Sequence, residues 1–186
     1  MRNIFAIGGI PGTGKTTLMN AIMKSIADDW VAEKPVDLLD SIYSKSRDTY
    51  VFGKYSPYYD AEGYAQGTDK LSMAVQPKAI EFIKETKSNI LFEGDRLFTA
   101  SLLEVCVELT DVETTIIILS ADDIEKRYAE RGSVQSEKFI QGRKTKYDNI
   151  AKNFFLWDNI VEMKHNTPED TQAIISLIHK EQDHEV

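Results

Sequence analysis

Eight residues near the N-terminus, Gly9 to Thr16, have the types and spacing that bind phosphate. They read Gly-Ile-Pro-Gly-Thr-Gly-Lys-Thr. Glycines let the backbone approach phosphate oxygens closely enough for consecutive amide hydrogens to bind the anion. Lys15 would reach the β- and γ-phosphates of a nucleotide, and the Thr16 hydroxyl would take a magnesium position. The sequence therefore predicts a phosphate-binding loop (P-loop) for ATP or a similar nucleotide with Mg²⁺.

The context of this loop favours phosphate binding over a simple glycine turn. An apolar, β-favouring run at residues 3–7 precedes it, and apolar residues at helical spacing follow from Leu18 to Trp30. A strand, a loop and the start of a helix are the arrangement that the motif requires. The predicted nucleotide-binding residues are Gly9, Gly12, Thr13, Gly14, Lys15, Thr16 and Thr17.

A second candidate group follows the apolar run at residues 90–92. Glu93, Asp95 and Arg96 would lie at the carboxyl end of a strand, on the same edge as the P-loop. Either acid could hold Mg²⁺ together with Thr16 or accept the proton of an attacking hydroxyl, and the arginine could neutralise a transferred phosphoryl group. The alternative is a turn whose acids and arginine pair in solvent.

A basic stretch interrupts an otherwise acidic chain. Arg127 and Arg131 are four residues apart, hence on one helix face, and Gly132-Ser133 then breaks the helical pattern as a hinge would. We expect a small helical lid over about 127–146 that brings these arginines, exposed when the site is empty, to the phosphates and excludes water. A solvated helix face is the alternative, and it is the favoured interpretation for the lysines Lys138, Lys144 and Lys146.

The segment 52–68 is rich in Gly, Tyr, Pro and Asp and indicates a long loop. Its tyrosines could stack on a flat ring or pack beneath the loop. Asp69 could orient or deprotonate an acceptor hydroxyl. The histidines show no metal-ligand spacing, so we expect solvent exposure or turn roles for His165, His179 and His184.

These candidates need a scaffold that brings strand ends together. Strand patterns at 3–7, 89–93, 114–119 and 161–164 alternate with helical patterns. Ser120 is a plausible N-cap for one helix, and Thr167-Pro168 is suited to begin the last one. Alternation at this spacing predicts a three-layer α/β/α sandwich with a central parallel sheet, whose ligands bind at the carboxyl ends of the strands.

Two stretches fit the alternation less well. Residues 36–50 mix strand and helix signals and are left unassigned. Helical spacing returns from Leu71 to Ile83, where Pro77 would kink the helix or begin its second part.

Composition limits the classes of function. The chain has 186 residues, of which 42% are hydrophobic, so we expect one domain over 1–186. The single cysteine, Cys106, and the lack of an initial apolar stretch favour the cytoplasm, and no apolar run is long enough for a membrane span. The net charge of -8 disfavours non-specific nucleic-acid binding without excluding a basic cleft. The oligomeric state is open.

With these residues in place, the chain resembles the P-loop kinases of nucleosides, nucleoside monophosphates and small metabolites, some of them bacteriophage-encoded. Asp95-Arg96 is similar to the Asp-Arg or Glu-Arg element of thymidylate and deoxynucleoside kinases, which implies that Arg96 contacts phosphate or substrate. Arg127 and Arg131 resemble lid arginines, and 166–168 resembles the loop that packs against adenine. Residues 36–40 show no clear counterpart of the catalytic acid that nucleoside kinases carry after their second strand.

The resemblance implies a kinase that moves the γ-phosphoryl group of Mg²⁺-ATP to a small, nucleoside- or nucleotide-like acceptor. Two alternatives are kept open. One is a kinase acting on a hydroxymethylated base in DNA, and the other, from a different class, is an ATP-hydrolysing switch or motor. The absence of an Asn-Lys-x-Asp guanine-reading motif makes a GTPase a poor reading.

Overall fold

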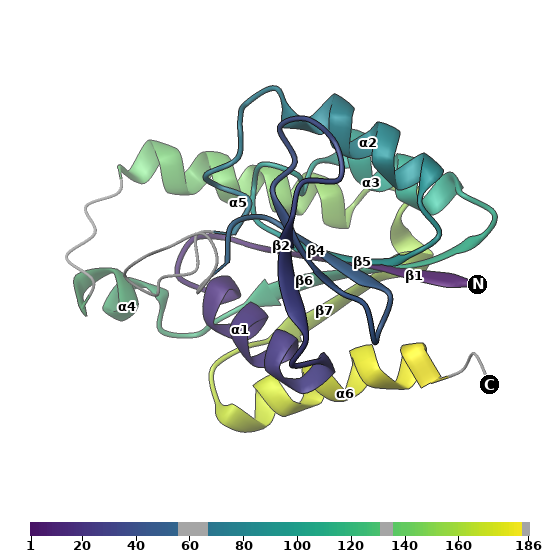
Figure 1. The fold of residues 1–186 in the computed structure, drawn as a ribbon. Helices are drawn as coiled ribbons and strands as arrows, with labels where there is room; N and C mark the ends of the chain where they lie inside the picture. Colours follow the sequence, from purple (N-terminus) through teal and green to yellow (C-terminus); the bar gives the residue numbers. More distant parts are fainter. Residues whose placement is uncertain (56–66, 131–135, 184–186) are drawn as a thin grey trace.

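A seven-stranded sheet covered by helices organises the chain in a computed structural model, which describes residues 1–55, 67–130 and 136–183 (Figure 1). The strands are β1 Arg2–Gly9, β2 Trp30–Glu33, β3 Ser41–Ser44, β4 Thr49–Phe52, β5 Asn89–Glu93, β6 Val112–Ser120 and β7 Ile160–Lys164. The helices are α1 Lys15–Ile26, α2 Val75–Glu85, α3 Ala100–Glu108, α4 Ile124–Glu130, α5 Glu137–Ala151, the short 3₁₀ helix η1 Trp157–Asn159, and α6 Pro168–Asp183.

The order of the strands places the first strand in the middle. The sheet runs β2-β3-β4-β5-β1-β6-β7, and the five strands from β4 to β7 in this order are parallel. The remaining two pair antiparallel, as β2 with β3 and β3 with β4. The predicted α/β/α fold class is confirmed, and the previously unassigned 36–50 region supplies β3 and the first residues of β4 as an extension of the parallel sheet.

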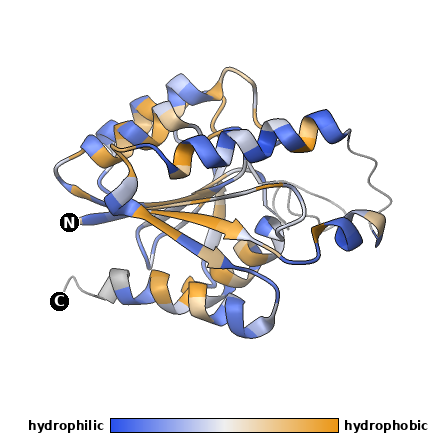
Figure 2. Cartoon of the chain, turned by 180° about the vertical axis from the view of Figure 1, so that it is seen from behind, coloured by the Kyte–Doolittle hydropathy of each residue, from blue (hydrophilic) through white to orange (hydrophobic). Residues whose placement is uncertain are grey.

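Two apolar layers flank the sheet. One core cluster joins residues of α2, α3 and α5 to the face of β1 that carries Ile4 and Ala6. The other joins α1 and α6 to the face that carries Phe5 and Ile7. Figure 1 shows these two helix groups on opposite sides of the sheet, and Figure 2 shows apolar residues along the strands and the sheet-facing sides of the helices. The alternation of residues along β1 thus supplies both cores.

The helical spacing predicted that Trp30 lies in the last turn of α1, but Trp30 begins β2. The helix ends at Ile26, and the Trp30 indole Nε1 donates to the carbonyl oxygens of Met23 at 3.1 Å and of Ala27 at 2.9 Å. The last carbonyls of a helix lack intrahelical donors. The buried tryptophan therefore satisfies the end of the helix from the next element.

Two other local predictions are corrected and one is confirmed. Ser120 is the last residue of β6 rather than an N-cap, and α4 begins at Ile124. Pro77 causes no kink, because α2 begins at Val75 and Pro77 lies in its first turn, where a missing amide hydrogen breaks no intrahelical bond. Thr167 accepts from the Asp170 amide at 3.2 Å and caps α6, as expected.

The predicted long loop begins after β4, and much of it lies outside the described residues, including Tyr58, Tyr59 and Tyr64. Its two ends are joined, since Lys54 and Gly67 exchange backbone hydrogen bonds of 2.8 and 3.0 Å. Among the described residues, no helix is both long enough and apolar enough to cross a membrane.

The cap on α1 gives a stability prediction. Trp30→Phe keeps a ring in the core but removes the indole donor, which leaves the Met23 carbonyl oxygen with the Ala27 amide alone and takes the side-chain donor from the Ala27 carbonyl oxygen. We expect the free energy of unfolding to fall by about 1–2 kcal/mol, measured by urea unfolding followed by circular dichroism. The control is Trp157→Phe, because Trp157 is 56% exposed, and its effect should stay within about 0.5 kcal/mol. Equal losses in the two variants would contradict this role of the indole.

Candidate functional site

A cavity of about 630 Å³ opens at the carboxyl ends of the parallel strands. Four segments line it: the P-loop with the first turn of α1, the segment that leads into α2, the segment after β5, and α5. The lining residues are Pro11, Gly12, Gly14, Lys15, Thr16 and Thr17, then Asp69, Met73 and Gln76, then Glu93, Asp95, Arg96 and Thr99, and finally Phe139 and Arg143.

The P-loop has the backbone that its glycines predict. Gly12 and Gly14 have φ values of 88° and 81°, in the left-handed region that other residues rarely adopt. Helix α1 begins immediately afterwards with no side-chain cap and no acidic residue in its first turn. The positive end of the helix therefore faces the cavity, which is the arrangement that binds anions.

Lys15 bends back over the loop. Its Nζ donates to the Gly9 carbonyl oxygen at 2.7 Å and to that of Ile10 at 3.3 Å. Burial lowers the pKa of this lysine, while the nearby Glu93 and Asp95 oppose the shift. The ammonium group lies in the cavity beside the helix terminus, where a phosphate would meet both.

Glu93 ends β5 and is 4% exposed. Burial raises its pKa from an ordinary 4.5 to about 7, with Lys15 opposing the shift. The Tyr55 hydroxyl donates to Glu93 Oε1 at 3.4 Å, and the absence of a side chain at Gly67 leaves room for the carboxylate. This carboxyl group therefore exchanges a proton near neutral pH.

Asp95 is held by three side chains of α5. Its carboxylate accepts from the Tyr147 hydroxyl at 2.7 Å and lies 3.2 Å from both Lys146 Nζ and Arg143 Nε. Burial opposes ionisation, but the tyrosine hydrogen bond and the two cations outweigh it and lower the pKa of Asp95. Lys146 is therefore not on a solvated helix face as predicted, whereas Lys138 and Lys144 are exposed.

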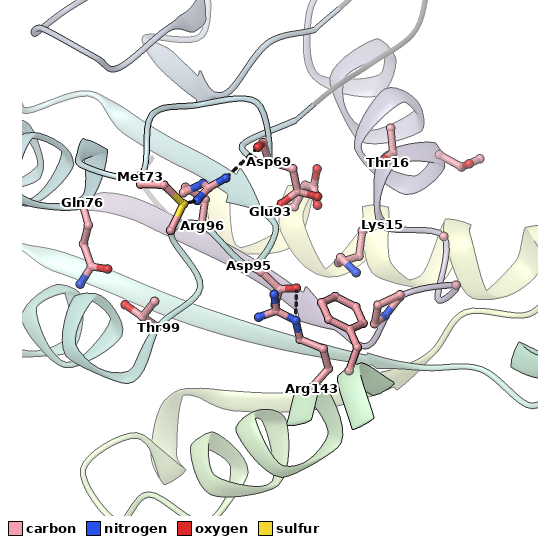
Figure 3. Close-up of a pocket in the computed structure, with 15 residues that line it drawn as sticks. Lys15, Thr16, Asp69, Met73, Gln76, Glu93, Asp95, Arg96, Thr99 and Arg143 are labelled. Atoms are coloured by element: carbon pink, nitrogen blue, oxygen red, sulfur yellow. Dashed lines mark hydrogen bonds and ion pairs between the residues drawn. The ribbon is translucent and has the colours of Figure 1, made fainter. Parts of the chain in front are cut away.

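Arg96 and Asp69 approach each other on the other side of the cavity. Arg96 Nη2 donates to the Asp69 carbonyl oxygen at 3.0 Å, and Nη1 contacts Met73 Sδ. The Asp69 side chain is exposed and lines the cavity. Figure 3 shows Arg96 and Asp69 together, with Lys15 and Thr16 toward one end of the pocket and Gln76 and Thr99 toward the other.

The exposure predicted for the first lid arginine is wrong. Helices α4 and α5 do occupy the predicted region, but Arg127 is half-buried rather than exposed. Its Nη1 donates to the Gly12 carbonyl oxygen at 3.1 Å, and its Nη2 donates to that of His165 at 3.2 Å. Arg131 and Gly132-Ser133 lie outside the described residues.

The sequence did not predict that His165 contacts the P-loop. It follows β7 as a turn residue would, but it is 8% exposed, and its Nδ1 lies 2.7 Å from the Thr13 carbonyl oxygen. His179 is half-buried with Nε2 3.1 Å from Ser25 Oγ, and His184 lies outside the described residues. In the sequence, only the position of His165 directly after the last predicted strand could have indicated this contact with the P-loop.

The structure brings most predicted site residues into one cavity. Gly9 and Thr13 support the loop from outside the lining: the Thr13 hydroxyl donates to the Ile10 carbonyl oxygen at 2.9 Å, and the Gly9 carbonyl binds Lys15. The sequence reasoning did not identify Met73, Gln76, Thr99 and Phe139 as lining residues, nor the ion pair of Arg143. The spacing of Arg143, Lys146 and Tyr147 on one helix face was the available signal for the contact with Asp95.

The oxygen-bearing residues of the cavity suit a metal ion whose remaining ligands come from the phosphates of a nucleotide. Among the described residues, no group of three or more His, Cys, Asp or Glu side chains could hold a metal. Mg²⁺ in phosphate sites keeps several waters and takes only one or two carboxylates, with phosphates completing the shell. Thr16, Glu93 and Asp95 line the same cavity as the helix terminus and supply oxygen donors of this kind.

Comparisons with known proteins agree with this architecture. Residues 1–179 match the model of a protein family described as P-loop Nucleotide Kinase3. A gluconokinase from Sinorhizobium meliloti 1021 has a similar structure, with a TM-score of 0.51 and 10% identity over 97% of each chain. An uncharacterized protein from Eubacterium ventriosum ATCC 27560 has a TM-score of 0.49 and 14% identity, covering 98% of this chain and 99% of that one. No curated protein matches the sequence. At 10% identity the first structure shows the fold alone.

The raised pKa of Glu93 predicts a pH dependence of stability. A group whose pKa is higher in the folded protein stabilises it below the unfolded pKa, and this contribution is lost as the pH rises through the folded value. The stability of the wild type relative to Glu93→Gln should therefore fall between about pH 4.5 and 7, by about 1.4 kcal/mol per pH unit at its steepest.

Urea unfolding from pH 5 to 8 without nucleotide or magnesium measures this difference. Glu108→Gln is the matched control, because Glu108 is exposed, and its stability difference from the wild type should not depend on pH. A Glu93→Gln difference that is equally flat would show that the carboxyl group ionises normally.

Proposed function

We propose, because the chain belongs to the P-loop Nucleotide Kinase3 family, that it is an ATP-dependent kinase for a small, nucleoside- or nucleotide-like acceptor. The observation that carries this proposal is the cavity, which joins a phosphate-binding helix terminus to acids and arginines at the end of a neighbouring strand. A nucleotide donor and an acceptor would meet there.

The P-loop side would bind the donor. The amides from Gly12 to Thr17 and the start of α1 would hold the β- and γ-phosphates, and the Lys15 ammonium would leave the Gly9 and Ile10 carbonyls to reach them. The two carbonyls hold the lysine within the cavity until the phosphates replace them. Mg²⁺, placed by Thr16 with Glu93 or Asp95, would neutralise phosphate charge when bound.

The opposite side would bind the acceptor and take its proton. An acceptor oxygen attacks the γ-phosphorus, the bond between that phosphorus and the bridging oxygen breaks, and ADP leaves with the bond's electrons. The hydroxyl proton would pass to a carboxylate, for which Glu93 is suited by a pKa of about 7 and Asp69 by its exposure. Arg96 would hold the acceptor or the phosphoryl group.

Asp95 would act through the cations that it holds. The carboxylate holds Arg143, which lines the cavity, and also binds Lys146, and these charges would act on the negative charge of the transferred group. Three donors of α5, Tyr147, Lys146 and Arg143, occupy most of the lone pairs of this carboxylate, which leaves less of it for a metal or a proton. Positioning of α5 is therefore the role of Asp95 that the contacts support most directly.

Incubation with ATP labelled in the γ-phosphate tests the function. The acceptors are nucleosides, nucleoside monophosphates, sugar acids including gluconate, and DNA with hydroxymethylated bases. Label in a small acceptor supports the proposal. Label in the DNA would favour a base-modifying kinase, and release of phosphate without any acceptor would favour a switch or motor.

Lys15→Ala should lower phosphoryl transfer by about 10³-fold or more while the fold is kept, because the ammonium contributes charge to the phosphates and little to the core. Turnover and melting temperature are measured with Lys144→Ala as control, since Lys144 is exposed on α5. ATP with Mg²⁺ at millimolar concentration should raise the melting temperature of the wild type through linkage. Normal turnover in Lys15→Ala would refute the P-loop assignment.

Asp95→Asn should lower kcat by about 10²-fold and change the dissociation constant of ATP by less than about threefold. The amide keeps an acceptor oxygen for Tyr147 but loses the charge that holds Arg143 and Lys146. Pre-steady-state transfer and equilibrium binding of ATP measure the two effects. Unchanged turnover with weaker ATP binding would instead place Asp95 in ground-state binding.

A further inference from the structure

Three consecutive carbonyl oxygens of the P-loop face three side chains from later parts of the chain. The Tyr128 hydroxyl donates to the Pro11 carbonyl oxygen at 2.5 Å, and Arg127 Nη1 to that of Gly12 at 3.1 Å. His165 Nδ1 lies 2.7 Å from the Thr13 carbonyl oxygen. A carbonyl oxygen only accepts, so Nδ1 carries the hydrogen in this contact. The outer side of the loop is thus bonded residue by residue.

These bonds have a consequence on the inner side of the loop. In a trans peptide, the carbonyl of one residue and the amide hydrogen of the next point in opposite directions. Holding the carbonyls of Pro11 and Thr13 outward therefore turns the amide hydrogens of Gly12 and Gly14 toward the opposite side. Both glycines line the cavity, so their amides are aimed where a phosphate would bind.

The same side chains pack on the two glycines. A β-carbon at Gly12 would lie 3.0 Å from Tyr128 Cε1, and one at Gly14 would lie 2.9 Å from His165 Nδ1. The absence of side chains at Gly12 and Gly14 thus serves two purposes: it permits the left-handed backbone, and it lets the two rings pack closely on the loop. The loop is closely packed on the side away from the cavity.

Two of the three residues are also bonded to each other, and one of them to α6. Arg127 Nη2 also donates to the His165 carbonyl oxygen at 3.2 Å, and His165 Nε2 lies 3.0 Å from Thr171 Oγ1 on α6. In the neutral ring Nε2 accepts from that hydroxyl, since the hydrogen is on Nδ1. Helix α4, the start of α6 and the P-loop are therefore linked through polar contacts.

We propose that Arg127, Tyr128 and His165 form a P-loop clamp that sets the affinity for the phosphates of the nucleotide by holding the loop amides in their binding orientation. The clamp rests on the proposed function, because its effect is measured on ATP. Its members are positioning residues: they act on the loop from outside, and the loop amides contact the phosphates. In this proposal Arg127 holds the P-loop before any nucleotide binds. The sequence predicted a different role, in which a lid arginine stabilises the transition state.

Two pairs of variants separate the clamp from general packing. Tyr128→Phe removes only the hydroxyl that binds the Pro11 carbonyl oxygen. Its control is Tyr43→Phe, because the Tyr43 hydroxyl on β3 binds Asp48 and neither residue lines the cavity. His165→Asn places an amide nitrogen near the Nδ1 position and keeps a donor for the Thr13 carbonyl. His165→Gln extends its amide nitrogen toward the Nε2 position and loses that donor.

Equilibrium binding of ATP, KM, kcat and the melting temperature without nucleotide are measured for each variant. We expect the dissociation constant and KM for ATP to rise about threefold to tenfold in Tyr128→Phe and in His165→Gln. They should stay within about twofold of the wild type in Tyr43→Phe and His165→Asn. At saturating ATP, kcat should change by less than about threefold in all four, because a loop that binds phosphate equally in ground and transition states affects KM.

Each result decides the proposal. If the wild type binds ATP and Tyr128→Phe binds it equally well, the clamp is refuted while the proposed function stands. If His165→Gln and His165→Asn weaken binding equally, the Nδ1 contact has no positioning role. Should His165→Gln fail to fold, Tyr128→Phe against Tyr43→Phe decides alone. If the wild type binds no ATP, the proposed function fails first and the clamp fails with it.

Discussion

The parallel pairing of β1 with β5 is the constraint on which the site depends. In this register Ile7 lies beside Glu93, so the chain leaves both strands at the same edge of the sheet. The P-loop follows one strand and the Glu93-to-Arg96 segment follows the other. A shift by one residue would turn Glu93 to the other face of the sheet and remove its carboxyl group from Lys15. The hydrophobic alternation of β1, whose two faces serve two cores, resists such a shift.

Burial gives the charged groups at this edge their properties. Glu93 is enclosed by Tyr55 and the backbone at Gly67, so its proton is retained to near neutral pH. Asp95 lies two residues farther along the chain and is also partly buried, but it faces Arg143 and Lys146 and stays ionised. The pKa values of two neighbouring acids thus shift in opposite directions, because Asp95 accepts a short hydrogen bond from Tyr147 and contacts two cations, whereas burial dominates at Glu93. An environment that separates the pKa values of two acids is one basis for assigning them different roles.

The sequence predicted the fold class and membership among P-loop kinases, because strand patterns and the glycine spacing are local signals. It also predicted which loops meet at the site, since the carboxyl ends of parallel strands share an edge. It did not predict contacts that depend on packing between distant elements, such as His165 with Thr13 or Lys146 with Asp95. Trp30 shows the limit at short range: its spacing suits a helix, but its indole binds the end of that helix from β2.

The two halves of the site are held by different forces. Helix α1, which would carry the phosphates, has five buried apolar residues, whereas α5 has two buried residues and α4 has none. What joins α4 and α5 to the site is mainly polar: the bonds to the P-loop carbonyls and those to Asp95. Hydrogen bonds of this kind contribute about 1 kcal/mol each, and elements with few buried apolar contacts open at low free-energy cost. Helix α1 is therefore fixed by the core, whereas α4 and α5 are attached to the site mainly through polar groups.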